Sequence, residues 1–345
     1  MKIAVIARCL PGQGRGGAGF QAHNLANRLV ARGHRVVVFS CGAKPVGAFY
    51  EHVSIPLPRI RHAGSTEAFL FPVYVAEQDY SSFDVIHAHD DNHFLVDPPA
   101  PLVRTFYGSA LWESLAASDP VDRMQKLALY PLEWLGGLRA SSAVAVSEHV
   151  RSCFPFIDLV IPCGVDLDVF YPGEEKTPDP TILFVGMLEG RERGRFLQEI
   201  FEKEVRPVLP RAQLWLVCGT EFSLPGVKAF SYVTEQRLAE MYRQAWVFCL
   251  PSTYEGFGAS YLEAMASGTP VVATPNPGAL EVLEEGRYGL LVSDESLGLA
   301  LAALLRDQGR RQFFARLGLK RCRIYAWEQV VSAYEELFEK IYRAS

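Results

Sequence analysis

Two glutamates eight positions apart lie in the stretch of this chain that is best suited to chemistry. Glu255 belongs to a short loop with Gly256 and Gly258, and Glu263 lies in the first turns of the helix that we expect to follow. The apolar run 245–250 before the loop predicts a buried strand. Because the glycines interrupt any continuous helix, both carboxylates can face one crevice at the strand's carboxyl end, where open α/β sheets bind ligands. Two solvated surface glutamates are the alternative.

The helix after this loop predicts an anion site. It begins near Ala259 and ends at Gly268, a residue type that terminates helices. Its first turn has N–H groups without helical partners and a partial positive charge, which suits a phosphate. The two loop glycines let the backbone approach such a ligand closely. Backbone N–H groups from Phe257 to Ala259 are therefore the expected phosphate donors.

A second glycine-rich loop, residues 11–19, follows the strand predicted at 2–7. A helix expected over 20–32 and a strand over 35–39 complete a β-loop-α-β unit. Such a loop can hold an anion at a helix N-terminus. Its glycines do not follow the spacing of the dinucleotide-binding motif, so an ordinary surface loop is the alternative.

Three histidines lie in or just after the strand predicted at 83–89. His87 and His89 are two residues apart and therefore share one face of the strand, and His93 follows Asp90 and Asp91. Imidazole and carboxylate groups are common metal ligands, so a metal site is one interpretation. A buried strand that holds no metal is the other.

Composition indicates a globular protein with more than one domain. The chain has 345 residues, 49% hydrophobic and 21% charged, and a formal net charge of −5. This length suggests two domains, and the negative charge gives no reason to expect nucleic acid as a partner. The seven cysteines are scattered, with no paired metal-ligand spacing, and a reducing cytoplasm fits them better than secretion. Residues 1–6 are typical of a first strand rather than a signal peptide, and no apolar run reaches the roughly 20 residues of a membrane span.

Strands and helices alternate in both halves of the chain, which predicts an α/β fold of two doubly wound domains facing a cleft. The polar, proline-rich segment 173–180 is the expected linker. The sequence therefore predicts an N-terminal domain at 1–172, a C-terminal domain at 173–325 and a last helix at 326–345. Residues 43–82 are expected to be irregular because they contain several prolines, and residues 230–234 to form a strand.

The sequence Glu-Gly-Phe-Gly from Glu255 is preceded by Pro-Ser, and Ala-Met-Ala-Ser-Gly-Thr-Pro-Val-Val follows Glu263. This stretch resembles the paired-glutamate signature of retaining glycosyltransferases with the GT-B fold, in particular family four, and the similarity extends over most of the chain. The resemblance implies two Rossmann-like domains, with residues 326–345 crossing back to the first. It implies transfer of a sugar, with retention at its anomeric carbon, from a nucleotide-diphosphate sugar to an acceptor hydroxyl. It implies no cofactor and no metal, and the strand 83–89 matches a family strand that uses no metal.

The resemblance also implies roles for individual residues. Glu255 would contact the transferred sugar and oppose the positive charge that develops on its ring, and Arg193 would hold the diphosphate as negative charge builds there. Glu263 would accept hydrogen bonds from ribose hydroxyls. The remaining donor-binding candidates are Gly16, Gly17, Gly186, Arg191, Gly256, Phe257, Gly258 and Ala259.

Three positions depart from the family pattern. Tyr107 stands where a histidine usually faces the reacting sugar, and with a pKa near ~10 a tyrosine is a poor base at neutral pH. Met187 replaces an arginine that binds the diphosphate, so Arg191 is the candidate for a second cation. Cys163 takes the asparagine position of a Pro-Asn-Gly-Val-Asp turn. Tyr107 and His89 are retained as candidate contacts to the acceptor or the sugar.

Two other functions fit the same architecture. One is a phosphorylase or an epimerase, and the other is a nucleotide-sugar-binding module without chemistry, which Met187 and Tyr107 favour. The expected partners are a nucleotide-diphosphate sugar and a sugar, lipid-linked or small-molecule acceptor. Apolar residues within 110–140 predict core packing, with an acceptor- or membrane-facing surface as the alternative. We expect a cytoplasmic protein, and peripheral contact with the inner face of the membrane stays open.

Overall fold

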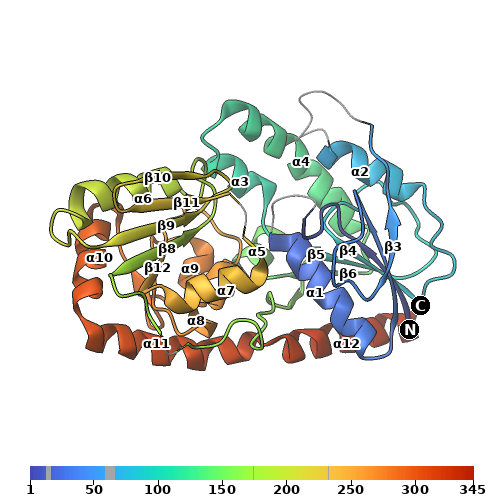
Figure 1. The fold of residues 1–345 in the computed structure, drawn as a ribbon. Coiled ribbons are helices and arrows are strands. Elements are labelled where there is room, and N and C mark those ends of the chain that lie inside the picture. Colours follow the sequence, from blue (N-terminus) through green and yellow to red (C-terminus); the bar gives the residue numbers. More distant parts are fainter. Residues whose placement is uncertain (13–16, 59–66, 174, 232) are drawn as a thin grey trace. The chain divides into compact units, whose positions relative to one another are not determined.

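The computed structural model describes residues 1–345 except 13–16, 59–66, 174 and 232. The chain forms two compact units, and Figure 1 labels their elements where there is room. Unit 1 comprises Met1–Leu115, Asp119–Cys163 and Trp327–Ser345, and unit 2 comprises Ala116–Ser118 and Gly164–Ala326. Residues 164–172, which the sequence analysis assigned to the first domain, thus group with the second unit.

Unit 1 is built on a seven-stranded sheet in which all paired neighbours are parallel. Its strands in spatial order are β3 (Glu51–Ser54), β2 (Arg35–Ser40), β1 (Lys2–Ile6), β4 (Val85–His89), β5 (Leu102–Phe106), β6 (Ser142–Ala145) and β7 (Leu159–Val160). The chain order reverses between β1 and β4, which is the place where doubly wound sheets bind ligands at the carboxyl ends of their strands.

The helices of unit 1 are α1 (Gly17–Ala31), α2 (Glu67–Ala76), α3 (Ala110–Ala116), α4 (Pro120–Leu138), α5 (Glu148–Cys153) and α12 (Trp327–Ala344). Leu25 and Leu29 of α1 pack into an apolar core together with β1 and β2. The apolar face of α12, including Val330, Tyr334 and Phe338, joins the same core. Although α12 comes last in the sequence, it therefore belongs to unit 1.

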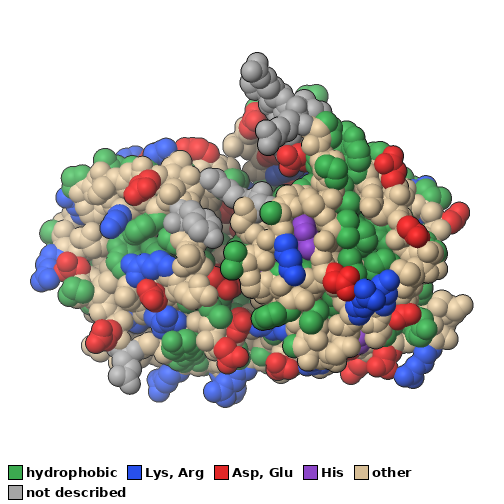
Figure 2. Space-filling model, turned by 45° about the vertical axis from the view of Figure 1, so that its right-hand side comes forward, with side chains coloured by type: hydrophobic (Ala, Val, Ile, Leu, Met, Phe, Trp, Pro, Cys, Tyr) green, Lys and Arg blue, Asp and Glu red, His purple; other side chains and the backbone are tan. Residues whose placement is uncertain are grey.

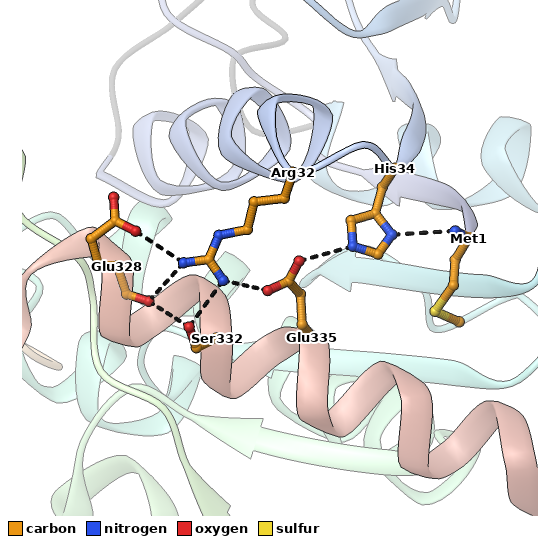
Figure 3. A network of polar contacts seen from close by, with 6 residues as sticks. All are labelled: Met1, Arg32, His34, Glu328, Ser332 and Glu335. Carbon is orange, nitrogen blue, oxygen red and sulfur yellow. Dashed lines mark hydrogen bonds and ion pairs between the residues drawn. The ribbon is translucent and has the colours of Figure 1, made fainter.

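Polar contacts also fasten α12 to the end of α1 (Figure 3). The Arg32 guanidinium donates to the Glu328 carboxylate at 3.0 Å and to the Ser332 hydroxyl at 2.9 Å, and it pairs with the carboxylate of Glu335. The other carboxylate oxygen of Glu335 lies 2.9 Å from Nε2 of His34. These ion pairs and hydrogen bonds join two helices that lie at opposite ends of the sequence.

Unit 2 has a second seven-stranded sheet. Its strands in spatial order are β10 (Phe222–Leu224), β11 (Val227–Phe230), β9 (Gln213–Val217), β8 (Thr181–Val185), β12 (Val247–Leu250), β13 (Val271–Ala273) and β14 (Leu290–Leu291). Only the edge hairpin of β10 and β11 is antiparallel among the pairs in the described residues. The chain order reverses between β8 and β12, so the predicted glycine loop leaves the sheet at its switch point.

The helices of unit 2 are α6 (Gly194–Ile200), α7 (Glu235–Gln244), α8 (Ala259–Ala266), α9 (Pro277–Val282), α10 (Leu297–Arg306) and α11 (Gln308–Cys322). A π-helical turn, η1 (Phe201–Val205), continues α6, and two short 3-10 turns are η2 (Asp294–Ser296) and η3 (Arg323–Tyr325). The strand β12 is buried along its whole length, because apolar residues fill both of its faces.

The predicted fold class is confirmed, since both units alternate strands and helices around parallel sheets. Three local predictions are wrong. Core packing was expected for the apolar residues within 110–140, but Trp112, Leu115, Met124 and Leu127 are exposed. Residues 43–82 contain β3 and α2, and α2 includes Pro72 because the burial of Phe71 and Val75 outweighs the cost of proline in a helix. The strand expected over 230–234 instead ends at Phe230, because a turn at Gly226, with φ +77°, starts it at Val227.

The surface carries both signs of charge. On the face drawn in Figure 2, acidic and basic side chains are interspersed among apolar and uncharged groups. This mixture agrees with the modest net charge of −5. Within the described part of the chain, no helix combines the length and the apolar character that a membrane span requires.

Candidate active site

The loop from β12 into α8 depends on glycine at Gly258. This residue has φ +89°, and a Cβ atom there would lie 2.4 Å from the ring of Tyr261. A left-handed backbone and this lack of space both exclude a side chain. Gly258 is the N-cap of α8, and the helix ends before Gly268, which has φ +68°. The predicted succession of strand, glycine loop and helix is therefore confirmed.

A second loop packs tightly against the first. A Cβ atom on Gly278 would lie 2.5 Å from the carbonyl oxygen of Phe257, and the Gly278 N–H donates to the carbonyl oxygen of Glu255 at 2.9 Å. Asn276 caps α9, because its Oδ1 accepts from the Ala279 N–H at 3.0 Å. The backbone of the glycine loop is thus fixed by the start of α9.

Glu255 is a buried carboxylate, with 9% of its surface exposed. Its Oε1 accepts a hydrogen bond of 2.8 Å from the hydroxyl of Ser252, and its Oε2 lies 3.8 Å from Nη2 of Arg191. The carbonyl oxygen of Ser252 in turn accepts from Thr274 Oγ1 at 2.8 Å and from Asn276 Nδ2 at 3.2 Å. A buried charge requires such partners, and here they also fix its orientation.

Glu263 lies half-buried in the second turn of α8. The hydroxyl of Tyr242, on α7, donates to its Oε2 at 3.0 Å. Burial raises the pKa of Glu263 to about 7, the hydrogen bond from Tyr242 acts in the opposite direction, and the negative charge of Glu235 adds to the rise. This carboxylate therefore changes its charge near neutral pH.

The Arg193 side chain contacts three connecting segments at the carboxyl edge of the sheet. Its guanidinium donates to both carboxylate oxygens of Asp294 at 2.7 Å, and its Nε donates to the carbonyl oxygen of Pro251 at 2.6 Å. Nη2 also lies 3.4 Å from Thr274 Oγ1. The hydrogen bond from Arg193 lowers the pKa of Asp294. Arg193, in the loop after β8, thus links the segments that follow β12, β13 and β14. Its predicted contact with a diphosphate stays a prediction.

Arg191 is the cation next to Glu255. Its Nε lies 3.1 Å from Glu192 Oε1, and 28% of its side chain is exposed. Its carbonyl oxygen accepts from the Thr253 N–H at 2.9 Å, which ties this loop to the one that carries Glu255. At Gly186, at the start of the same loop, a Cβ atom would lie 2.9 Å from the side chain of Glu192. Arg191, rather than Arg193, is therefore the arginine nearest to the buried glutamate in the described site.

In unit 1, the glycine predictions fall partly outside the described residues. Gly16 lies among residues 13–16, which the structure does not describe, and Gly17 is exposed at the start of α1. Sequence reasoning did not single out Gly19, where a Cβ atom would lie 2.0 Å from the carbonyl oxygen of Cys9. Glycine at this position lets α1 approach the end of β1 closely.

Tyr107 and His89 are brought together at the ends of β5 and β4. Nδ1 of His89 lies 2.7 Å from the Tyr107 hydroxyl. Burial lowers the pKa of His89 to about 3, so its ring is neutral at physiological pH, and burial raises the pKa of Tyr107 well above its usual value. His87 faces Thr105 instead, at 2.9 Å. Among the described residues, no group of three or more histidine, cysteine or carboxylate side chains could hold a metal ion.

Beside them lies a buried cluster of charged side chains that was not predicted from the sequence. Arg104 is 1% exposed, donates to Asn92 Oδ1 at 2.8 Å and lies 3.9 Å from the Asp90 carboxylate. Asp90 and Asp91 have φ of +67° and +41°, and Arg8 lies 3.7 Å from Asp91. Burial raises the pKa of Asp90 to about 7. The available signal was an arginine in the middle of an apolar strand, which requires counter-charges.

Comparison with known proteins places both halves of the chain in glycosyltransferase families. Residues 15–169 match the family model described as Glycosyltransferase Family 4, and residues 179–307 match the one described as Glycosyl transferases group 1. The chain is 28% identical to a phosphatidyl-myo-inositol mannosyltransferase of Mycobacterium leprae, over 94% of this chain and 93% of the relative. It is 25% identical to an alpha-maltose-1-phosphate synthase of Mycolicibacterium smegmatis, over 99% of this chain and 100% of the relative.

Solved structures share the fold at low sequence identity. A sucrose-phosphate synthase from Thermosynechococcus elongatus matches with a TM-score of 0.82 and 22% identity, covering 100% of both chains. Anabaena HepE, solved in complex with UDP and glucose, matches with a TM-score of 0.76 and 16% identity, covering 99% of this chain and 100% of that one. With both halves matched by glycosyltransferase models and the whole fold shared with these structures, the chain belongs to the GT-B glycosyltransferases of the family four type.

Proposed function

We propose that this chain transfers a sugar from a nucleoside diphosphate sugar to an acceptor hydroxyl, with retention at the anomeric carbon and without a metal ion. Unit 2 would bind the donor, and unit 1 would supply the acceptor side. The observation that carries the proposal is the buried Glu255, oriented by Ser252 and lying 3.8 Å from Arg191, on the glycine loop that enters α8.

The start of α8 suits the donor's diphosphate. Backbone N–H groups at Phe257, Gly258 and Ala259 precede or begin the helix, where they are not used by helical hydrogen bonds. Glu263, one turn further, would accept hydrogen bonds from the ribose hydroxyls. Anabaena HepE, which shares the fold, was solved with UDP and with UDP-glucose, which supports a nucleoside diphosphate sugar as the donor class.

Glu255 would act where positive charge develops. As the bond from the anomeric carbon to the diphosphate breaks, the sugar ring becomes cationic and the diphosphate gains negative charge. A fixed carboxylate beside the ring and a cation beside the diphosphate lower the energy of this charge-separated state. Arg191 and the N-terminus of α8 would provide the positive partners, which is the reason for proposing chemistry without a metal.

The acceptor side would lie at the carboxyl edge of the unit 1 sheet. Tyr107 and His89 present a linked hydroxyl and neutral imidazole there, which suits contacts to sugar hydroxyls. Gly17 begins α1 at the same edge. Relatives named for maltose 1-phosphate synthesis and for mannosyl transfer to phosphatidyl-myo-inositol support an acceptor that is a sugar or a lipid-linked polyol.

A ligand screen followed by product analysis tests this proposal. Thermal unfolding with UDP, ADP, GDP and their common sugars should single out one nucleotide, because a ligand at about 100 times its dissociation constant adds about 2.7 kcal/mol of stability. Incubation of that donor with sugar and lipid-linked acceptors in chelator should then yield product, and NMR of its anomeric proton should show the donor's own configuration. An inverted anomer would reject retention, and activity abolished by chelator and restored by a divalent ion would reject the metal-free mechanism.

A further inference from the structure

The second glutamate of the site is held by a buried tyrosine. Tyr242 is 0% exposed, and its ring packs against Phe170 and Phe248 with centroids 5.8 and 5.3 Å away. Its hydroxyl donates to Glu263 Oε2 at 3.0 Å. Its backbone carbonyl accepts from Thr269 Oγ1 at 2.6 Å. The ring and the backbone of Tyr242 are therefore fixed by other groups, so its hydroxyl fixes the carboxylate rather than the reverse.

The two oxygens of Glu263 are not equivalent. Oε2 receives the Tyr242 hydroxyl, whereas Oε1 has no hydrogen-bond partner in the described part of the chain. Burial raises the pKa of Tyr242 well above its usual value, and the charge of Glu263 adds to the rise, so the phenol keeps its proton and can only donate to the carboxylate. One oxygen is thus occupied by the protein, and the other can accept from a ligand.

We propose that Tyr242 is a positioning residue for donor recognition, which orients the Glu263 carboxylate so that Oε1 accepts from the ribose hydroxyls of the nucleotide. The inference rests on the proposed function, because it takes Glu263 as the ribose-binding group. It adds a residue from α7, outside the glycine loop and α8, to the donor site.

The hydrogen bond also controls the charge of Glu263. α8 packs against α7, α9 and α11, and Tyr242 and Glu235, both on α7, are the titratable groups that act on Glu263 in the described chain. The Tyr242 hydroxyl stabilises the ionised form, whereas burial and Glu235 disfavour it. Removal of the hydroxyl therefore raises the pKa of Glu263 further and protonates it at neutral pH. A protonated carboxyl group is a weaker acceptor for ribose hydroxyls.

Tyr242→Phe provides the direct test, with calorimetry of UDP, ADP or GDP, whichever binds wild type most tightly. If loss of the bond makes the carboxylate about tenfold more basic, its ionised fraction at pH 7 falls from about one half to about one tenth. Affinity should then weaken at least fivefold at pH 7, and the loss should become about fivefold smaller between pH 7 and pH 9, where the carboxylate is ionised again. A loss that remains at pH 9 measures the altered orientation of the carboxylate. In a Glu263→Gln background, the tyrosine substitution should have no further effect.

Two controls separate positioning from general damage. Tyr80→Phe removes another buried hydroxyl, which donates to the Val75 carbonyl oxygen at 3.0 Å in unit 1, and it should leave nucleotide affinity unchanged at every pH. The 2′,3′-dideoxy form of the same nucleotide lacks the hydroxyls that Glu263 would recognise. Its affinity for wild type should lack the component that titrates near pH 7, a measurement that stands even if Tyr242→Phe does not fold.

The possible results are distinguishable. Nucleotide affinity of Tyr242→Phe equal to wild type at pH 7, together with a loss in Glu263→Gln, would overturn the positioning role and leave the donor site intact. A loss in Tyr242→Phe of the same size at pH 7 and pH 9 would also overturn it, because general disruption of the site does not depend on pH. Unchanged affinity in Glu263→Gln would reject the ribose assignment of the proposed function, and the present inference with it.

Discussion

Glu255→Gln is the most direct test of the proposed chemistry. In the structure, Ser252 donates to one carboxylate oxygen and Arg191 lies 3.8 Å from the other. An amide of the same shape keeps an acceptor for Ser252 but removes the negative charge. The substitution therefore changes electrostatics at the site, while the glycine loop, which is fixed by backbone contacts to Gly278, keeps its conformation.

Two magnitudes follow from these contacts. Loss of one preorganised electrostatic partner typically lowers kcat by about 100- to 1,000-fold, or about 2.7–4 kcal/mol. The pair with Arg191 is lost as well, but that arginine is 28% exposed and keeps its contact with solvent, and a buried carboxylate charge no longer has to be desolvated. The free energy of unfolding should therefore change by about 1 kcal/mol or less. We expect kcat to fall far more than nucleotide affinity, because Glu255 would act mainly in the transition state.

The assay combines initial rates of transfer from the identified donor with calorimetry of the nucleoside diphosphate. Glu199→Gln is the matched control, because Glu199 lies on the exposed side of α6 in the same unit and pairs there with Lys203 of η1. That variant should retain full turnover. Turnover near the wild-type value in Glu255→Gln would remove Glu255 from the catalytic role. An equal loss of nucleotide affinity and turnover would instead indicate that Glu255 supports ground-state binding.

Three further predictions concern the neighbouring contacts. Arg191→Ala should lower turnover at least tenfold, whereas Arg193→Ala should mainly destabilise unit 2, by about 1–3 kcal/mol, because it removes a bidentate ion pair with Asp294 and a hydrogen bond to a carbonyl oxygen. Rate assays and urea unfolding compare the two variants. The reverse pattern would indicate that Arg193, and not Arg191, binds the diphosphate. Gly258→Ala should lower the free energy of unfolding by about 1–3 kcal/mol and weaken nucleotide binding, because Gly258 has φ +89° and the Tyr261 ring occupies the Cβ position. A melting temperature equal to that of wild type would contradict this prediction. Glu335→Gln should lower the free energy of unfolding by about 1 kcal/mol, because it weakens the ion pair with Arg32. The melting temperatures of both proteins, measured over a range of salt concentrations, show whether the lost stability is electrostatic. A salt dependence equal to that of wild type would exclude an electrostatic origin.

Local sequence signals were enough to specify the secondary structure of the site. The apolar run before Pro251, the glycines of the loop and Gly268 after the helix specified strand, loop and helix, because each depends on backbone conformations set by a few neighbouring residues. The alternation of such segments specified two doubly wound α/β units for the same reason. Where local signals conflicted, as with the prolines of residues 43–82, packing against the sheet decided and the prediction was wrong.

Which side chains meet depends on the fold and not on local sequence. Tyr242 and Glu263 are 21 residues apart, and Arg193 and Asp294 are 101 residues apart, yet each pair is joined by hydrogen bonds. No periodicity encodes such pairs, because they depend on the order in which strands enter the sheet and on which loops then share its carboxyl edge. Sequence alone therefore identified the two glutamates, whereas the fold supplied Ser252, Tyr242 and Asp294, the groups that hold the charged side chains in place.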